Sequence, residues 1–107
     1  MITFEYFKKI EIRIGKIILA EKVENSNKLL KLKVDFGSEQ RQILAGIAKF
    51  YEPESLVGKQ CPFAFNLEPK ILGELESQGM ILCPSDENSQ PVLLHPDKEV
   101  LPRALIK

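Results

Sequence analysis

The sequence predicts an all-β fold, and three observations support this prediction. Apolar and polar residues alternate with a period of two in the segments 10–14 and 30–36. Clusters of glycine, proline, serine and asparagine separate the alternating runs, and only residues 53–57 read as a helical turn. The chain has 107 residues, of which 44% are hydrophobic and 28% charged, so we expect one globular domain.

The first expected strand spans residues 10–20. Residues 10–14 read Ile-Glu-Ile-Arg-Ile, with the isoleucines facing one way and the charged residues the other. Gly15 interrupts this alternation. Because a glycine inside a strand commonly marks a bulge or a sharp bend, we expect the strand to change register at Gly15 and to continue over 16–20.

A second strand is predicted at 30–36, after a polar loop at 21–29. Its alternation is strict, so four apolar side chains are expected to face inward: Leu30, Leu32, Val34 and Phe36. Lys31 and Lys33 then stand side by side on the outer face. Three further strands are predicted at 41–47, 59–67 and 80–83. The helical turn, at 53–57, lies between the first and second of them.

This order of elements is that of an OB-fold, a five-stranded Greek-key barrel with a short helix between strands three and four. We divide the chain into an N-terminal segment (1–9), the barrel (10–84) and a C-terminal β extension (85–107), in which 92–94 is a further strand. In an OB-fold the loops 21–29 and 68–79 would border the ligand face. The second is long, and long loops in compact domains tend to be functional. A β-sandwich or an unrelated barrel with a plain solvated surface is the alternative.

No residue pattern indicates catalysis. His95 is the only histidine, and Cys61 and Cys83 lie in apolar strands, where buried unreactive thiols are expected. Two cysteines are too few for a structural zinc site, and no glycine-rich phosphate loop is present. We therefore expect no catalytic residue, no metal and no cofactor. The chain has no apolar run of about 18 residues and no signal peptide, so we expect a cytoplasmic protein without a membrane partner.

The distribution of charge favours a polyanionic ligand. The net charge is zero, but residues 8–33 contain eight basic and three acidic side chains. Four cations on or near the proposed face are candidates for phosphate contacts: Lys28, Lys31, Lys33 and Arg41. Asn66 and Ser77 are candidates for polar contacts with bases and sugars, and Met80 for an apolar contact with a base. The alternative is a protein-docking barrel whose lysines only solubilise it.

The tail is more apolar than a closed five-stranded barrel requires. Its apolar residues are the predicted interface of a homodimer: Leu93, Leu94, Val100, Leu101, Leu105 and Ile106. A tail that caps one end of its own barrel is the other interpretation.

Several spaced motifs resemble those of the tRNA-binding domain family. This family includes the C-terminal domain, or separate beta chain, of methionyl-tRNA synthetases and small stand-alone structure-specific tRNA-binding proteins. The similarity covers nearly the whole chain and is carried by the segments 11–17, 28–32, 41–49, 56–59, 66–69 and 76–80.

The resemblance implies an OB-fold with a C-terminal extension, a homodimer, and recognition of tRNA by its shape. It also implies a methionyl-tRNA synthetase catalytic chain as partner, in cis or in trans. The residues that match positions of the family's binding motifs are Lys28, Asn66, Lys70, Ser77 and Met80. Glu68 and Glu74 depart from the family pattern, so we expect weaker phosphate contacts here. A free-standing tRNA-binding protein or RNA chaperone is the alternative within the family.

Overall fold

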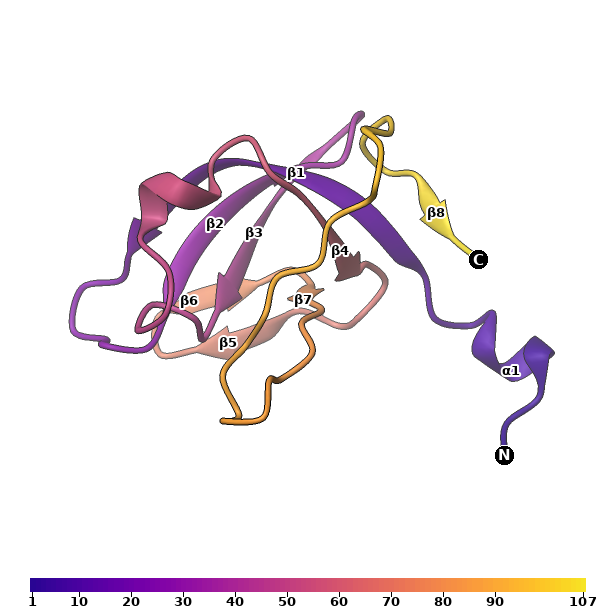
Figure 1. The fold of residues 1–107 in the computed structure, drawn as a ribbon, viewed down its shortest axis with the longest axis horizontal. Helices are drawn as coiled ribbons and strands as arrows, with labels where there is room; N and C mark the ends of the chain where they lie inside the picture. Colours follow the sequence, from indigo (N-terminus) through magenta and orange to yellow (C-terminus); the bar gives the residue numbers. More distant parts are fainter.

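The longest strand, β1 (Ile12–Lys22), crosses the whole molecule and pairs with three other strands (Figure 1). The computed structural model describes residues 1–107. The second half of β1 pairs with β2 (Leu30–Asp35) and the first half with β4 (Gln60–Ala64), both antiparallel. With β3 (Gln40–Ala45) and β7 (Met80–Ile81), the sheet has the order β3-β2-β1-β4-β7. The all-β, OB-like barrel predicted from the sequence is confirmed.

The register of β1 shifts between Ile17 and Leu19, so the change predicted at Gly15 is wrong in position. Gly15 has a different role. A Cβ atom at this residue would lie 2.4 Å from Val34 Cγ1 and 2.7 Å from Phe36 Cε1. The glycine therefore lets β1 lie directly against the side chains of β2, and the bulge occurs further along, where β1 has separated from β4.

The interior of the barrel contains the side chains that the alternation predicted. Leu30, Leu32, Val34 and Phe36 are each 0% exposed. The Phe36 ring packs edge-to-face against Phe63 and Phe65, with centroid separations of 5.5 and 5.0 Å, which is one of the geometries that aromatic pairs prefer. The predicted helical turn is a 3-10 helix, η1 (Pro53–Leu56), and its Leu56 is also fully buried.

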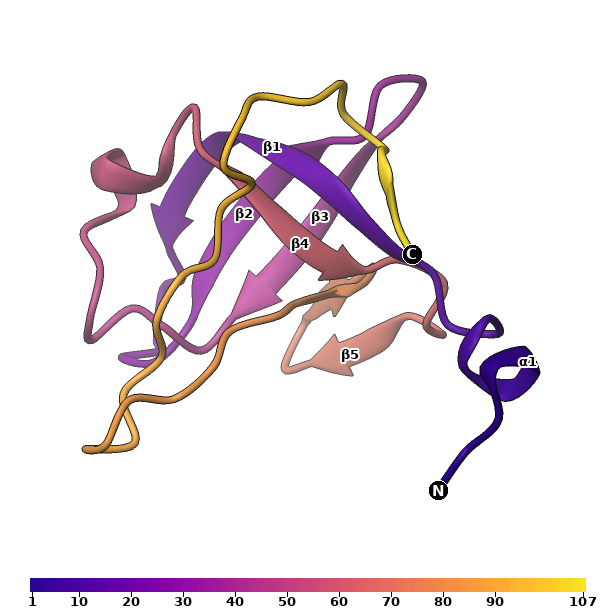
Figure 2. The ribbon, with the colours of Figure 1, turned by 45° about the vertical axis from the view of Figure 1, so that its right-hand side comes forward.

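The segment 68–79, expected to be a loop, contains a β-hairpin. Its strands are β5 (Lys70–Leu72) and β6 (Leu75–Ser77), and Gly73 adopts a φ of +64° in the turn. Three-residue strands are too short to produce a recognisable alternation, which is why the sequence pattern did not predict them. The hairpin lies beside the main sheet (Figures 1 and 2).

The free edge of β3 is closed by residues 76–78 rather than by a regular strand. The Gln78 N–H donates to the Gln42 carbonyl at 2.8 Å, and the Gln42 N–H donates to Gln78 Oε1 at 2.9 Å. The Leu44 N–H donates to Ser77 Oγ at 3.0 Å. The side-chain oxygens of Gln78 and Ser77 thus accept the N–H groups that the carbonyls of a neighbouring strand would otherwise accept, and they close the barrel at this edge.

The tail runs as an extended strap along the outside of the barrel (Figure 2). The strand predicted at 92–94 is absent, because the main chain there is held by other groups: the Leu93 N–H donates to Tyr51 Oη at 3.2 Å. Further along, the Gln60 amide bonds both the N–H and the carbonyl of Val100. Only β8 (Leu105–Ile106) is a strand, paired with the start of β1.

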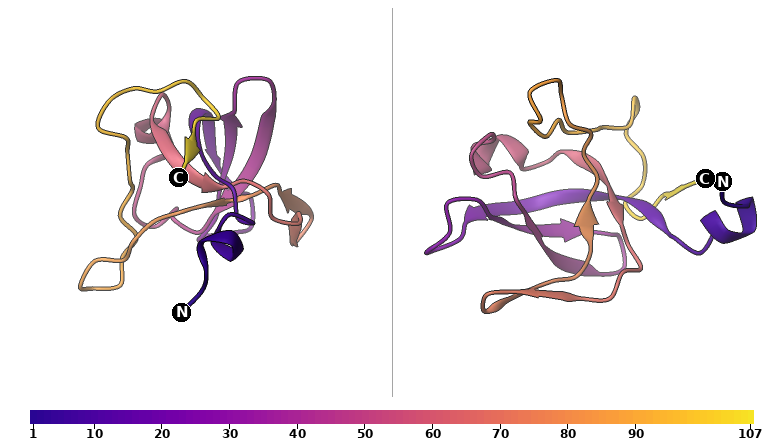
Figure 3. Two further views of the ribbon diagram at one scale, coloured as in Figure 1. Left: turned by 90° about the vertical axis from the view of Figure 1, so that its right-hand side faces the viewer. Right: turned by 90° about the horizontal axis from the view of Figure 1, so that it is seen from below.

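Both termini lie at the same end of the molecule (Figure 3). The short helix α1 (Phe4–Phe7) begins after Thr3, whose hydroxyl accepts the Tyr6 N–H at 3.1 Å. Neither α1 nor η1 has the length and hydropathy that a membrane-spanning helix requires.

The close approach at Gly15 gives a first testable prediction. Gly15→Ala should lower the free energy of unfolding by about 1–3 kcal/mol, because the added methyl group overlaps Val34 and Phe36. Gly46→Ala is the matched control, since nothing lies within 4 Å of a Cβ atom there. Urea denaturation of both variants measures the difference, and equal stabilities would contradict the packing role assigned to Gly15.

Candidate nucleic-acid interface

A groove of about 750 Å³ lies between the first loop and the tip of the β5–β6 hairpin. Its lining comes from residues 21–26, Leu29 and Lys31 on one side and from residues 72–75 on the other. These are the two loop regions that border the ligand face of an OB barrel. The fold therefore brings together the two segments that the sequence predicted to form the site.

The charge of this groove is mixed rather than basic. Lys22 and Lys31 are accompanied by three glutamates, Glu21, Glu24 and Glu74. Lys31 Nζ lies 2.9 Å from Glu21 Oε1, and both side chains are substantially exposed, so the pair contributes little to stability. In the free protein, however, Glu21 neutralises the positive charge of Lys31, which is one of the residues predicted to contact phosphate.

Lys28 and Lys33 are exposed cations at the edges of this region and, like Lys22 in its lining, make no ion pair. Lys33 stands on the outer face of β2, opposite Leu19 of β1 and Gln42 of β3. Lys28 lies at the end of the first loop, where its carbonyl accepts the Ala48 N–H at 3.0 Å. Their ammonium groups are available to an anionic ligand, and their backbones are held in place.

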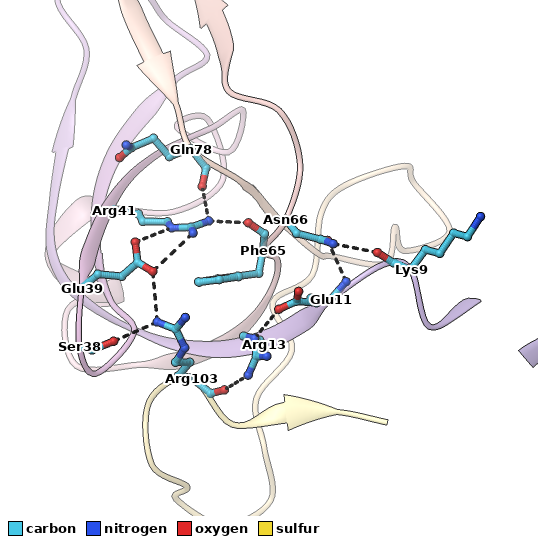
Figure 4. Close-up of polar contacts among 10 residues, drawn as sticks. All are labelled: Lys9, Glu11, Arg13, Ser38, Glu39, Arg41, Phe65, Asn66, Gln78 and Arg103. Carbon is cyan, nitrogen blue, oxygen red and sulfur yellow. Dashed lines mark hydrogen bonds and ion pairs between the residues drawn. The ribbon is translucent and has the colours of Figure 1, made fainter. Parts of the chain in front are cut away.

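Arg41, in contrast, is engaged by the protein itself (Figure 4). Its guanidinium stacks on Phe65, with Cζ 3.6 Å from the ring centroid, and donates to the Phe65 carbonyl. It also donates to Glu39 at 3.1 Å. The hydrogen bond from Arg41 lowers the pKa of the Glu39 carboxyl, so Glu39 stays ionised beside it.

Arg41 belongs to an arginine cluster that sequence reasoning did not find. Arg13 and Arg103 also stand over the Phe65 ring, with Cζ 5.5 and 4.9 Å from its centroid. Arg103 donates to Glu39 at 3.1 Å, and Arg13 donates to the Arg103 carbonyl at 2.9 Å. The members come from β1, β3 and the tail, so no local pattern indicates that they meet (Figure 4).

Asn66 also makes contacts within the protein. Its side-chain oxygen accepts the Glu11 N–H and its amide donates to the Lys9 carbonyl, both at 2.8 Å. It therefore connects the end of β4 to the segment that precedes β1. A direct contact of Asn66 with a nucleic acid stays a prediction.

The three remaining predicted residues differ in exposure. Lys70, at the start of β5, is exposed, and Met80 is 49% exposed. Ser77 is only 5% exposed, and its hydroxyl accepts the Leu44 N–H and donates to the Gly79 carbonyl. In this structure Ser77 closes the barrel beside β7, the strand that carries Met80.

The predicted dimer residues differ in exposure, and Leu94 and Leu101 are 43% and 84% exposed. Leu93 packs on the core, and Val100 is partly covered. Leu105 and Ile106 are 47% and 41% exposed at the end where α1 presents Phe4 and Tyr6, which are 64% and 59% exposed (Figure 3). We call these four residues the terminal patch.

The lining of the groove contains neither histidine nor cysteine. No group of three or more histidine, cysteine or acidic side chains is placed to hold a metal ion. Cys61 is fully buried, and its desolvation raises the pKa of the thiol to about 11. His95 Nδ1 lies 2.7 Å from the Gln60 carbonyl, to which it donates.

Comparison with known proteins identifies the family. Residues 12–103 match the family described as "Putative tRNA binding domain". The chain belongs to this tRNA-binding domain family, and the resemblance inferred from its motifs is confirmed. It is 51% identical over 100 residues to the methionine–tRNA ligase of Methanothrix thermoacetophila; this covers 94% of the chain but 15% of that relative's length.

Solved structures agree along the whole chain. A MetRS-related protein from Pyrococcus horikoshii superposes with a TM-score of 0.94 at 37% identity, covering 100% of this chain and 98% of the other. The chaperone CsaA of Bacillus anthracis superposes with a TM-score of 0.89 at 32% identity, covering 100% and 99%. The chain is thus similar both to one region of a ligase and to two solved chains that it covers almost entirely.

The position of Ser77 gives a second prediction. Ser77→Ala should lower the free energy of unfolding by about 1–3 kcal/mol, because it leaves the buried Leu44 N–H without an acceptor. Ser85→Ala, at an exposed position, should change it by less than about 0.5 kcal/mol. Thermal and urea denaturation measure both. A Ser77→Ala protein as stable as the wild type would rule out the closing role.

Proposed function

We propose that this domain is a tRNA-binding module that raises the affinity of a methionyl-tRNA synthetase for tRNA and carries out no reaction itself. The observation that carries the proposal is the match of residues 12–103 to the family, together with a groove at the ligand face of the barrel. The methionyl-tRNA synthetase catalytic chain would be the partner, in cis or in trans, and the location the cytoplasm.

The proposed contacts divide by chemistry. Lys28, Lys33 and Lys70 are exposed and would neutralise phosphates, which carry no sequence information. Met80 would supply an apolar surface for a base or sugar. Arg41, Asn66 and Ser77 are engaged by protein groups, so we propose that they act by positioning the strands that carry the contacts. Recognition would then depend on the shape of the tRNA.

The glutamates of the groove limit the strength of this binding. Glu21 pairs with Lys31, and Glu24 and Glu74 add negative charge along the same walls. We therefore propose that one domain binds tRNA weakly. A homodimer, or attachment to a catalytic chain, would compensate, because a second contact made within one complex is favoured by its high effective concentration.

A free-standing tRNA-binding protein or RNA chaperone is the second candidate. The observation that favours it is the similarity to CsaA, which covers both chains almost completely. A protein-docking barrel without a nucleic-acid ligand is the candidate from another class. A gel shift with tRNA, using single-stranded DNA as competitor, separates the tRNA-binding candidates from the docking barrel.

The proposed phosphate contacts predict a salt dependence. With about three contacts, a plot of the logarithm of the association constant against the logarithm of salt concentration should have a slope of roughly −2 to −3. Lys28→Ala should make the slope shallower by about one and weaken different tRNA species alike. Met80→Ala should weaken binding without changing the slope, since its side chain is uncharged.

Two variants make this test specific to the groove. Glu21→Gln removes the partner of Lys31 and should strengthen binding and steepen the slope. Lys98→Ala, an exposed lysine in the tail outside the groove lining, should have no effect. A Lys98→Ala effect equal to that of Lys28→Ala would show that a different face binds tRNA.

We also propose that the domain dimerises through the terminal patch. The helix α1 and the strand β8 lie at the same end of the molecule and carry these four exposed apolar side chains, and exposed apolar patches commonly mark interfaces (Figure 3). Sedimentation equilibrium at micromolar concentration should give twice the mass of the chain. Ile106→Glu should shift the protein to monomers, whereas Leu19→Glu, at a similarly exposed position in β1, should not. A monomeric wild-type protein would exclude the dimer.

A further inference from the structure

The two cysteines of the chain occupy opposite positions on neighbouring segments. β7 pairs with β4 so that Phe63 lies opposite Ile81. The same register continues beyond β7, because the Leu82 N–H donates to the Pro62 carbonyl at 3.0 Å. The next pair along this register is Cys61 with Cys83.

This pair has the geometry of a cross-strand disulfide site. Hydrogen-bonded and non-hydrogen-bonded pairs alternate along an antiparallel ladder, and Pro62–Leu82 is a hydrogen-bonded one. Cys61 and Cys83 therefore form a non-hydrogen-bonded pair, whose Cα atoms are typically about 4.5 Å apart. Disulfides join residues with Cα separations of about 4.4–6.8 Å.

The two side chains also point to the same face. Cys61 is two residues from Phe63, and Cys83 is two residues from Ile81. Phe63 belongs to the core and Ile81 packs against it, so residues two positions away along each segment face the core as well. Cys61 is fully buried and Cys83 partly exposed, and both thiols are free in this structure.

A polar group stands beside the buried thiol. His95 Nδ1 lies 3.7 Å from Cys61 Sγ and 2.7 Å from the Gln60 carbonyl. A ring N–H at Nδ1 donates to the Gln60 carbonyl, and the ring nitrogen lies in longer polar contact with the sulfur. Lys59 is a further favourable charge near the same sulfur.

We propose that Cys61 and Cys83 are a redox pair that forms an intramolecular disulfide in the presence of a low-molecular-weight disulfide such as oxidised glutathione. The Cys83 thiolate attacks one sulfur of the oxidant and displaces one glutathione thiolate. The Cys61 thiolate then attacks the Cys83 sulfur and displaces the second. The two cysteines are oxidised, the oxidant is reduced to two thiols, and the two cysteine protons end on those thiols.

The order of the two steps follows from exposure. Cys83 is accessible to a small molecule, whereas Cys61 is not. Burial raises the pKa of both thiols, that of Cys61 to about 11, so the pKa shifts slow both steps and the order rests on exposure. The bond would close a loop that contains the whole β5–β6 hairpin, and would hold the strand that carries Met80 against β4.

The test uses the reduced protein incubated with oxidised glutathione and then analysed by intact mass, alkylation and peptide mapping. We expect loss of two hydrogens, no alkylation of either cysteine, and one peptide pair joined through Cys61 and Cys83. The melting temperature should rise by roughly 10 °C, and dithiothreitol should reverse the rise, because the cross-link restricts the unfolded chain.

Single variants separate the two thiols. In Cys61→Ala, Cys83 should stop at the mixed disulfide with glutathione; in Cys83→Ala, Cys61 should stay unmodified while the protein is folded. The proposal is overturned if the wild type ends as a mixed disulfide, as a dimer linked through Cys83, or with both thiols free. These readouts need no tRNA and so do not depend on the proposed function.

Discussion

The structure depends on the hydrogen bonds along the outer edge of β3. An edge strand that pairs with no neighbour would leave its main-chain N–H and carbonyl groups without partners. Its N–H groups at Gln42 and Leu44 find acceptors on the side chains of Gln78 and Ser77. A buried main-chain donor without a partner costs free energy, so these side chains are as necessary as a strand would be. Closing the barrel here also sets the position of β7 and of the hairpin, and therefore of the groove.

Arginines and lysines have different tasks in this domain. Three arginines stack around Phe65 and bond to carboxylates and carbonyls, and they hold β1, β3 and the tail together. A planar guanidinium suits this role, since it can stack and donate in several directions at once. Lys28, Lys33 and Lys70 are instead exposed, and we propose that they contact phosphates. A charge count of the sequence does not distinguish these tasks.

The sequence predicted correctly those features that depend on residues close together in the chain, and it missed features that depend on contacts between distant residues. Strict alternation over 30–36 predicted the inward residues correctly, because a strand with one buried face has only one possible register. The hairpin at 70–77 and the course of the tail were not predicted. The hairpin strands are too short to show an alternation, and the course of the tail depends on Gln60 and Tyr51, which lie far away in sequence.

By itself, the sequence determined the barrel class, the core of β2, the membership of the tRNA-binding domain family and the two segments that border the groove. These features follow from local periodicity and from motifs that are contiguous in the chain. Only the tertiary structure decided that Arg41, Asn66 and Ser77 bond to the protein, that Glu21 pairs with Lys31, and that the register of β4 and β7 brings the segments of Cys61 and Cys83 together. Each of these contacts joins residues that are far apart in the sequence. Folding brings them within a few ångströms, and a local sequence pattern does not indicate which distant residues will meet.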